Sequence, residues 1–200
     1  MTQKEMDLLT RHFCHYFQQE EPMVLHPEHM EPHIDGLLYK PDETFPFWKF
    51  VTMGASDHRM KAPKSALGNR NEYMMFIDPE VDMTDKETVN WYWERLLTVA
   101  LYSLSTGDFV SYGHSMEWPT EEGEEMVGAY LEMPQCVPDV GVLRCKLGLF
   151  KTAVCLQVIT LTRQELDKLL CIGSEQFSYF LYPDEGKPHY LCERTRSEKF

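Results

Sequence analysis

The sequence predicts a single α+β domain in which helices flank a mixed β-sheet. Its 200 residues fit one domain of ordinary size. Segments rich in β-branched and aromatic residues alternate with segments of helical periodicity, without an internal repeat, a low-complexity linker or a shift in composition. With 43% apolar and 26% charged residues, the chain has the composition of a globular protein rather than a disordered one. We therefore expect one domain over residues 1–200.

The first half begins with a helix and continues with strands. Met6, Leu9 and Phe13 recur at helical spacing and predict an amphipathic helix over 4–20, which Pro22 ends. The proline-rich segment 22–32 is expected to be a loop. Strands are expected where apolar and aromatic residues cluster between turn signals. These strands span 33–40, 45–53 and 71–77, with an irregular segment over 54–70.

The clearest element is a helix over 85–105. Thr84 and Glu87 have the spacing of a capping box at its start, and Gly107 is placed to stop it. Apolar residues at steps of three and four predict the face that packs on the sheet. This face comprises Val89, Trp93, Leu96, Leu97, Ala100 and Leu104. Trp91 lies about 200° around the helix from Trp93, so it either packs against another element or is exposed as a contact.

The second half predicts further strands and two short helices. The strands are expected near 126–133, 142–150 and 153–160. Thr162 and Glu165 form a second capping box, which opens a helix that Gly173 closes. A last helix is expected over 175–181.

The chain is acidic, with a formal net charge of −13. This balance argues against nucleic-acid binding, which needs a basic surface, and is compatible with a basic protein partner. No run of apolar residues is long enough to predict a membrane span. Charges among the first 21 residues leave no apolar signal-peptide core, which favours a cytoplasmic location. A turn is expected at 183–186, and the polar tail at 186–200 has a local charge of +2.

Six cysteines are scattered singly, without a Cys-x-x-Cys pair. In a chain without a signal peptide, this pattern indicates reduced thiols, most of them small core residues. Cys145 and Cys155 could face each other across a hairpin, and we expect these two to be thiols as well. No glycine-rich phosphate-binding motif occurs, so no cofactor is expected.

His26, His29 and His33 form the first candidate for a metal site. Together with two nearby carboxylates they could hold zinc. However, two prolines interrupt the helix that usually presents such ligands on one face, and His33 begins a predicted strand, where it points away from the other two. We expect a polar surface loop and no metal. A metalloenzyme using His26, His29 and nearby carboxylates stays open as an alternative.

Ser56, Asp57 and His58 are the residue types of a serine hydrolase, but they are consecutive. Adjacent residues cannot orient one another as a catalytic triad, so no catalysis is expected there. A different cluster lies in a predicted loop at 120–125, which concentrates four carboxylates: Glu121, Glu122, Glu124 and Glu125. This loop could bind a cation or a basic partner, although such runs are most often solvated loops.

Residues 33–60 resemble a known family. His33-Ile-Asp-Gly-Leu-Leu-Tyr-Lys-Pro is followed by Phe47-Trp-Lys-Phe-Val-Thr-Met-Gly-Ala-Ser-Asp-His-Arg-Met60, a combination similar to the suppressor of fused domain family. That family has a His-Ile-Asp-type strand, a turn with proline, and an apolar strand that runs into Thr-x-Gly-x-Ser with a methionine after it. The strand at 71–77, the Trp91–Leu104 helix and residues 159–165 occupy similar places, so the resemblance covers about residues 30–182.

The resemblance implies an α+β domain without catalytic activity that works by binding another protein. The chain is similar to the short bacterial members, which are proposed to supply immunity against toxins of polymorphic toxin systems. A toxin-neutralising immunity protein with a basic toxin domain as its partner is therefore the first hypothesis. The alternative is a general scaffold or regulator that binds a peptide at a free sheet edge.

The Thr52–Ser56 part of the motif is expected to be a structural strand exit, because glycine allows the backbone to bend there. If a contact surface exists beside it, its polar candidates are Asp57, His58 and Arg59.

Overall fold

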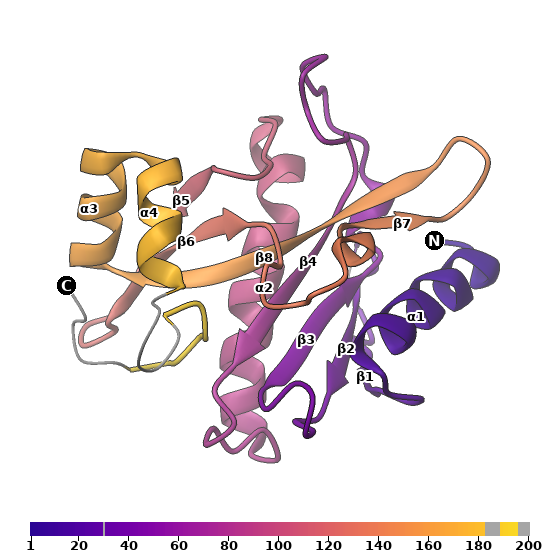
Figure 1. Ribbon diagram of the computed structural model, residues 1–200, viewed down its shortest axis with the longest axis horizontal. Helices are drawn as coiled ribbons and strands as arrows, with labels where there is room; N and C mark the ends of the chain where they lie inside the picture. The colour runs from indigo at the N-terminus through magenta and orange to yellow at the C-terminus, as the bar shows by residue number, and fades with distance from the viewer. Residues whose placement is uncertain (30, 183–188, 196–200) are drawn as a thin grey trace.

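Eight strands form one mixed sheet in the computed structural model, which describes residues 1–29, 31–182 and 189–195. The strand order is β1-β2-β3-β4-β8-β6-β5, and β7 pairs with β8 off this path (Figure 1). Among the paired strands of the described residues, β4 and β8 run parallel and the other pairs are antiparallel. The bounds are Met23–Leu25 (β1), Asp35–Tyr39 (β2), Trp48–Met53 (β3), Asn71–Ile77 (β4), Ser115–Glu117 (β5), Met126–Glu132 (β6), Arg144–Lys146 (β7) and Thr152–Thr162 (β8).

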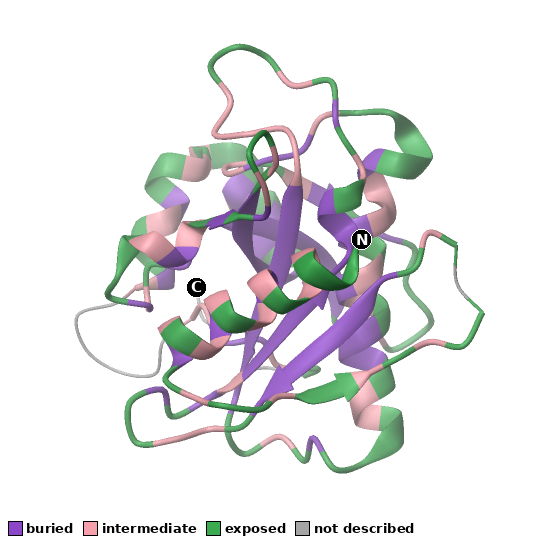
Figure 2. Cartoon of the chain, turned by 90° about the vertical axis from the view of Figure 1, so that its right-hand side faces the viewer, coloured by how far each residue is buried: buried purple, intermediate pink, exposed green. Residues whose placement is uncertain are grey.

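Helices cover both faces of this sheet, which confirms the predicted α+β class. They are α1 (Gln3–Phe17), α2 (Lys86–Thr106), α3 (Arg163–Ile172) and α4 (Ser174–Leu181), with short 3₁₀ turns η1 (Ala55–Asp57) and η2 (Val140–Leu143). The α2 helix packs on one face, and α1 packs with η2 and β7 on the other. Figure 2 shows α1 in front of the buried strands. The α3–α4 pair encloses a third apolar cluster at the β6–β8 end of the sheet (Figure 1).

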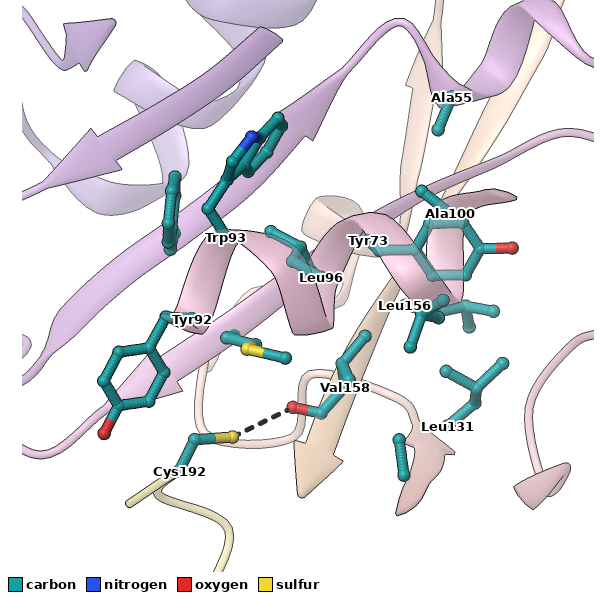
Figure 3. Close-up of a cluster of buried hydrophobic side chains, with 14 of the residues drawn as sticks. Ala55, Tyr73, Tyr92, Trp93, Leu96, Ala100, Leu131, Leu156, Val158 and Cys192 are labelled. Carbon is teal, nitrogen blue, oxygen red and sulfur yellow. Dashed lines mark hydrogen bonds between the residues drawn. The ribbon is translucent and has the colours of Figure 1, made fainter. Parts of the chain in front are cut away.

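The buried face of α2 differs from the predicted one in part. Trp93, Leu96 and Ala100 are buried against the sheet, as expected (Figure 3). Leu104 is 45% exposed, because it lies in the last turn of α2, where the neighbouring Ser103 is buried instead. Tyr92 is fully buried, since the segment around Cys192 packs beside it. Because the segment around Cys192 packs on α2 in addition to the sheet, the buried face of α2 is wider than the stripe that periodicity predicts.

The C-terminal segment completes the sheet where β4 and β8 separate. Their pairing ends at Met74 and Gln157. Beyond that point Cys192 bridges the strands: its N–H donates to the Phe76 carbonyl (2.7 Å) and its thiol to the Val158 carbonyl (3.3 Å, Figure 3). Backbone groups that the diverging strands leave unpaired thus find partners in residues far along the chain.

Several predicted boundaries are confirmed. The strand at 71–77 has those bounds. Gly107 ends α2 in a left-handed conformation (φ 78°), with its N–H bonded to the Ser103 carbonyl. Thr162 and Glu165 form the predicted capping box.

Other boundary predictions are wrong. The first helix ends at Phe17 with Gln18 in a left-handed conformation, and the expected loop at 22–32 contains β1. The N-cap of α2 is Asp85 rather than Thr84. The Thr84 hydroxyl donates to the Asp82 carboxylate (2.6 Å), and the Asp85 carboxylate accepts from the Thr88 N–H instead. The strand predicted at 142–150 is η2 followed by the short β7, and β5 was not predicted.

The six cysteines are free thiols, and Cys145 lies opposite Ala153 rather than Cys155. The turn predicted at 183–186 and most of the polar tail lie outside the described residues. Within the described part of the chain, no helix is both long and apolar enough to cross a membrane.

Candidate partner-binding surface

The Thr-x-Gly-x-Ser strand exit is organised around a buried carboxylate, that of Glu72 on β4. The Thr52 hydroxyl donates to one carboxylate oxygen (2.6 Å), and the N–H groups of Gly54 and Ser56 donate to the other (3.0 Å each). Burial raises the pKa of Glu72, although these hydrogen bonds act in the opposite direction. The sequence places Glu72 in the next strand without indicating this role, because the contact depends on the pairing of β3 with β4.

Gly54 is required at this turn for two reasons. Its backbone has a φ of 128°, which side chains rarely tolerate, and a Cβ would lie 2.6 Å from the His33 carbonyl. The motif is therefore a tightly held strand exit, whose polar groups face inward to Glu72.

Asp57, His58 and Arg59 follow this turn and lie at the surface. The carboxylate of Asp57 pairs with Lys151, which also contacts Glu5 (3.0 Å). Partial burial raises the pKa of Asp57, but the hydrogen bond from Lys151 and its charge outweigh this and lower it. His58 is half-buried, with its Nε2 3.5 Å from the Ser103 hydroxyl, and Arg59 is exposed. Asp57 thus has an internal structural role, while Arg59 is more available to a partner.

The acidic loop at 121–125 forms one wall of a pocket of about 260 Å³. Trp91, Glu94 and Arg95 from the N-terminal half of α2 also line this pocket, and so does Arg194. Glu121, Glu122 and Glu125 are exposed. Five acidic residues and two basic ones line the pocket, so its net charge is negative.

Glu124 differs from the other three acidic residues because it anchors the loop to α2. Its Oε1 accepts hydrogen bonds from the Trp91 indole (3.1 Å) and from Arg95. Partial burial raises the pKa of Glu124, but the hydrogen bond and charge of Arg95 outweigh it and lower the pKa. The Arg95 guanidinium lies over the rings of Trp91 (5.3 Å) and Trp118 (5.5 Å). Trp91 is therefore packed against another element, one of the two alternatives that the sequence left open.

The two predicted contact surfaces do not meet. The acidic loop is held at Trp91 and Arg95, whereas His58 lies beside Ser103 near the other end of α2. The eight residues from Arg95 to Ser103 span about 12 Å of helix. A partner would have to reach along α2 to contact both.

His26 and His33 meet at the carboxylate of Asp35, contrary to the expectation that His33 points away. His26 Nδ1 lies 2.8 Å and His33 Nε2 3.0 Å from the same Asp35 oxygen. His29, which the sequence paired with His26, lies outside this cluster. The register of β1 and β2 explains the meeting: Leu25 pairs with Gly36, so the next residue, His26, comes beside Asp35. His33 and Asp35 are two residues apart, a spacing that can place side chains on one side of an extended segment.

The main strand path ends at β1 and β5, and β7 is a further edge strand beside β8; each of the three has three residues. Such short edge strands offer few backbone groups for pairing with another chain. Met23 and Val24 of β1 are exposed, at 42% and 58%. Peptide binding at a sheet edge, the scaffold alternative, therefore has little support from the described strands.

Comparison with known proteins gives a consistent assignment. A sequence profile described as Suppressor of fused protein (SUFU) matches residues 30–190. A SUFU homologue from Neisseria gonorrhoeae has a similar structure, with a TM-score of 0.70 at 13% identity, covering 98% of this chain and 97% of that one.

Two further solved structures are similar to the chain. The structure of the Sufu-Fu complex contains a chain with a TM-score of 0.61 at 14% identity, covering 88% of this chain and 83% of that one. Drosophila Suppressor of Fused has a TM-score of 0.58 at 15% identity. The similar region covers 88% of this chain and 45% of that one. Comparison with curated proteins gave no match. Because the profile covers most of the chain, the protein belongs to the suppressor of fused (SUFU) family.

Proposed function

We propose that this chain is a non-enzymatic, cytosolic protein-binding domain that neutralises a basic toxin domain as an immunity protein. Family membership supports the binding role, since one relative was solved in a Sufu-Fu complex. The six free cysteines are compatible with a reducing compartment. The observation that carries the choice of a basic partner is the acidic pocket beside Trp91.

The chemistry of this pocket suits a basic side chain. Two arginines of the chain itself, Arg95 and Arg194, lie over the Trp91 ring at 5.3 and 6.0 Å. The exposed residues Glu121, Glu122 and Glu125 line the same pocket. The Trp91 ring is packed within the chain, so an arginine or lysine of a partner would meet the negative charge of these exposed residues, and the net charge of −13 would favour its approach.

The direct test is protection of cells. The chain is co-expressed with a toxin domain encoded beside its gene, and both survival and co-purification are measured. Replacing Glu121, Glu122 and Glu125 by glutamine should weaken both. Glu124 stays intact because it anchors the loop to Arg95.

A matched control removes the same number of negative charges at exposed residues outside the pocket. The exposed residues Glu20, Glu21 and Glu43 are replaced by glutamine. This variant should protect like the original chain. Equal weakening in both variants would show that net charge, rather than the pocket, matters. Absence of both protection and co-purification would remove the immunity proposal.

Asp57, His58 and Arg59 are proposed as a second contact surface. Asp57 is unsuited to a test, because its loss would also disturb Lys151. Replacing Arg59 by alanine and His58 by glutamine probes the surface with less structural effect, since Arg59 is exposed. Unchanged co-purification of both variants would exclude this surface.

A further inference from the structure

The β1–β2 connection brings three metal-ligating side chains together. His26 directly follows β1, His33 lies two residues before β2, and Asp35 is the first residue of β2. The ring centroids of the two histidines are 4.7 Å apart. One ligand atom from each of the three residues lies within 4.8 Å of the other two. The geometry points to a binding site for a divalent transition-metal ion, and we propose that the ion is Zn²⁺.

The donor set selects the class of metal. Two imidazole nitrogens and one carboxylate oxygen match the ligands that zinc takes in proteins. Mg²⁺ and Ca²⁺ prefer sites built from oxygen alone, so the two imidazoles disfavour them. Three protein ligands leave one tetrahedral position, which water occupies at sites of this type.

The distances require little movement. Ligand atoms of a tetrahedral zinc ion, each about 2.0–2.1 Å from the metal, are roughly 3.3–3.4 Å from one another. His26 Nδ1 and His33 Nε2 lie 2.8 and 3.0 Å from the Asp35 oxygen. Lengthening these two contacts by a few tenths of an ångström would bring them to the spacing of zinc ligands, and the ion would then take the place of the two His–Asp hydrogen bonds.

The exposure of the three residues provides both an anchor and an entry path. The Asp35 side chain is only 3% exposed and is fixed on β2, whereas those of His26 and His33 are 62% and 43% exposed. A metal can thus enter from solvent between the two rings and settle on the buried carboxylate. Binding would tie the connection between β1 and β2 to the sheet.

The experiment titrates Zn²⁺ into chain purified without a histidine tag and stripped with a chelator, with a chromophoric chelator as competitor. We expect one tight equivalent, with affinity that rises with pH because the imidazoles must be deprotonated. His26→Ala and His33→Ala should each lower the affinity by more than the roughly 10–100-fold typical of losing an outer-shell partner. Both residues are exposed, so these variants should fold, which circular dichroism checks.

The matched control is His29→Ala, an exposed histidine of the same loop outside the cluster. It should bind zinc like the original chain. Co²⁺ substitution gives an independent readout, since nitrogen and oxygen ligation lacks the thiolate charge-transfer band that any of the six cysteines would produce. No tight binding, equal loss in His29→Ala and His33→Ala, or a thiolate band would each overturn the proposal.

Discussion

The hydroxyl of Thr52 donates a 2.6 Å hydrogen bond to the buried carboxylate of Glu72, and the same hydroxyl accepts from the Tyr73 N–H (2.9 Å). One side chain of β3 therefore serves two successive residues of β4. Gly54 and Ser56 complete the set with their N–H groups. The most specific part of the family motif is thus a set of donors assembled around one carboxylate from the neighbouring strand.

We predict that removing this carboxylate strongly destabilises the fold. Glu72→Ala leaves three buried donors without their acceptor, namely the Thr52 hydroxyl and the N–H groups of Gly54 and Ser56, and each unsatisfied buried donor costs about 1–3 kcal/mol. Thr52→Val should cost about 1–3 kcal/mol, since it removes one donor and leaves its partners unpaired. Urea unfolding measures both. Thr52→Ser retains the hydroxyl and is the control; a loss as large as that of Thr52→Val would contradict the hydrogen-bond explanation.

Trp93→Ala is predicted to cost about 3–5 kcal/mol of unfolding free energy, as deletion of a buried large aromatic side chain does. Trp93 is 7% exposed and its ring lies 5.5 Å from that of Phe50. Periodicity assigned Leu104 to the same helix face as Trp93. Leu104→Ala should nevertheless change the free energy of unfolding by less than about 0.5 kcal/mol, because the Leu104 side chain is partly exposed. A loss below about 1 kcal/mol for Trp93→Ala would refute its placement in the core.

Gly36 explains how this tryptophan is accommodated. A Cβ at Gly36 would lie 2.7 Å from the Phe50 ring and 3.1 Å from the Trp93 ring. We predict that Gly36→Ala destabilises the protein and that Gly36→Ala combined with Trp93→Leu loses less than the sum of the single changes, because the smaller side chain makes room. Strict additivity in urea unfolding would show that the two positions do not share this space.

Electrostatic steering should appear in the kinetics of partner binding. Replacing Glu121, Glu122 and Glu125 by glutamine should lower the association rate and flatten its salt dependence, with a smaller effect on dissociation. Raising salt from about 0.05 to about 0.5 M should act similarly, because the Debye length falls from roughly 14 to roughly 4 Å. Surface-based kinetics on both forms checks this. An association rate insensitive to salt and to the substitutions would rule out steering by this loop.

Thiol reactivity should follow burial. Cys171 is exposed and should react rapidly with a thiol reagent in the native protein, whereas Cys145, Cys155 and Cys192 should react only after unfolding. Burial also raises the pKa of the Cys145 thiol to about 12, so little reactive thiolate forms there. Mass spectrometry after brief labelling identifies the sites. Rapid native labelling of Cys192 would contradict its position between β4 and β8.

The sequence alone determined the features that depend on neighbouring residues. Strand bounds at 71–77 follow from an apolar and aromatic run that the turn residues Asp78 and Pro79 stop. The Thr162–Glu165 capping box and the stop at Gly107 follow from cap chemistry and glycine conformation, which also act within a few residues. The fold class and the family resemblance followed from the order of such segments and from one motif.

Only the tertiary structure decided which distant groups meet. The pairing of β1 with β2 places His26 beside Asp35. The 121–125 loop packs on α2, where Glu124 bonds to Trp91 and Arg95. Cys192 bonds to β4 and β8 beyond the point where these two strands stop pairing. These contacts depend on strand order and register, which are set by the packing of the whole sheet. Local periodicity carries no information about them, because the same helix or strand pattern can pair with many neighbours.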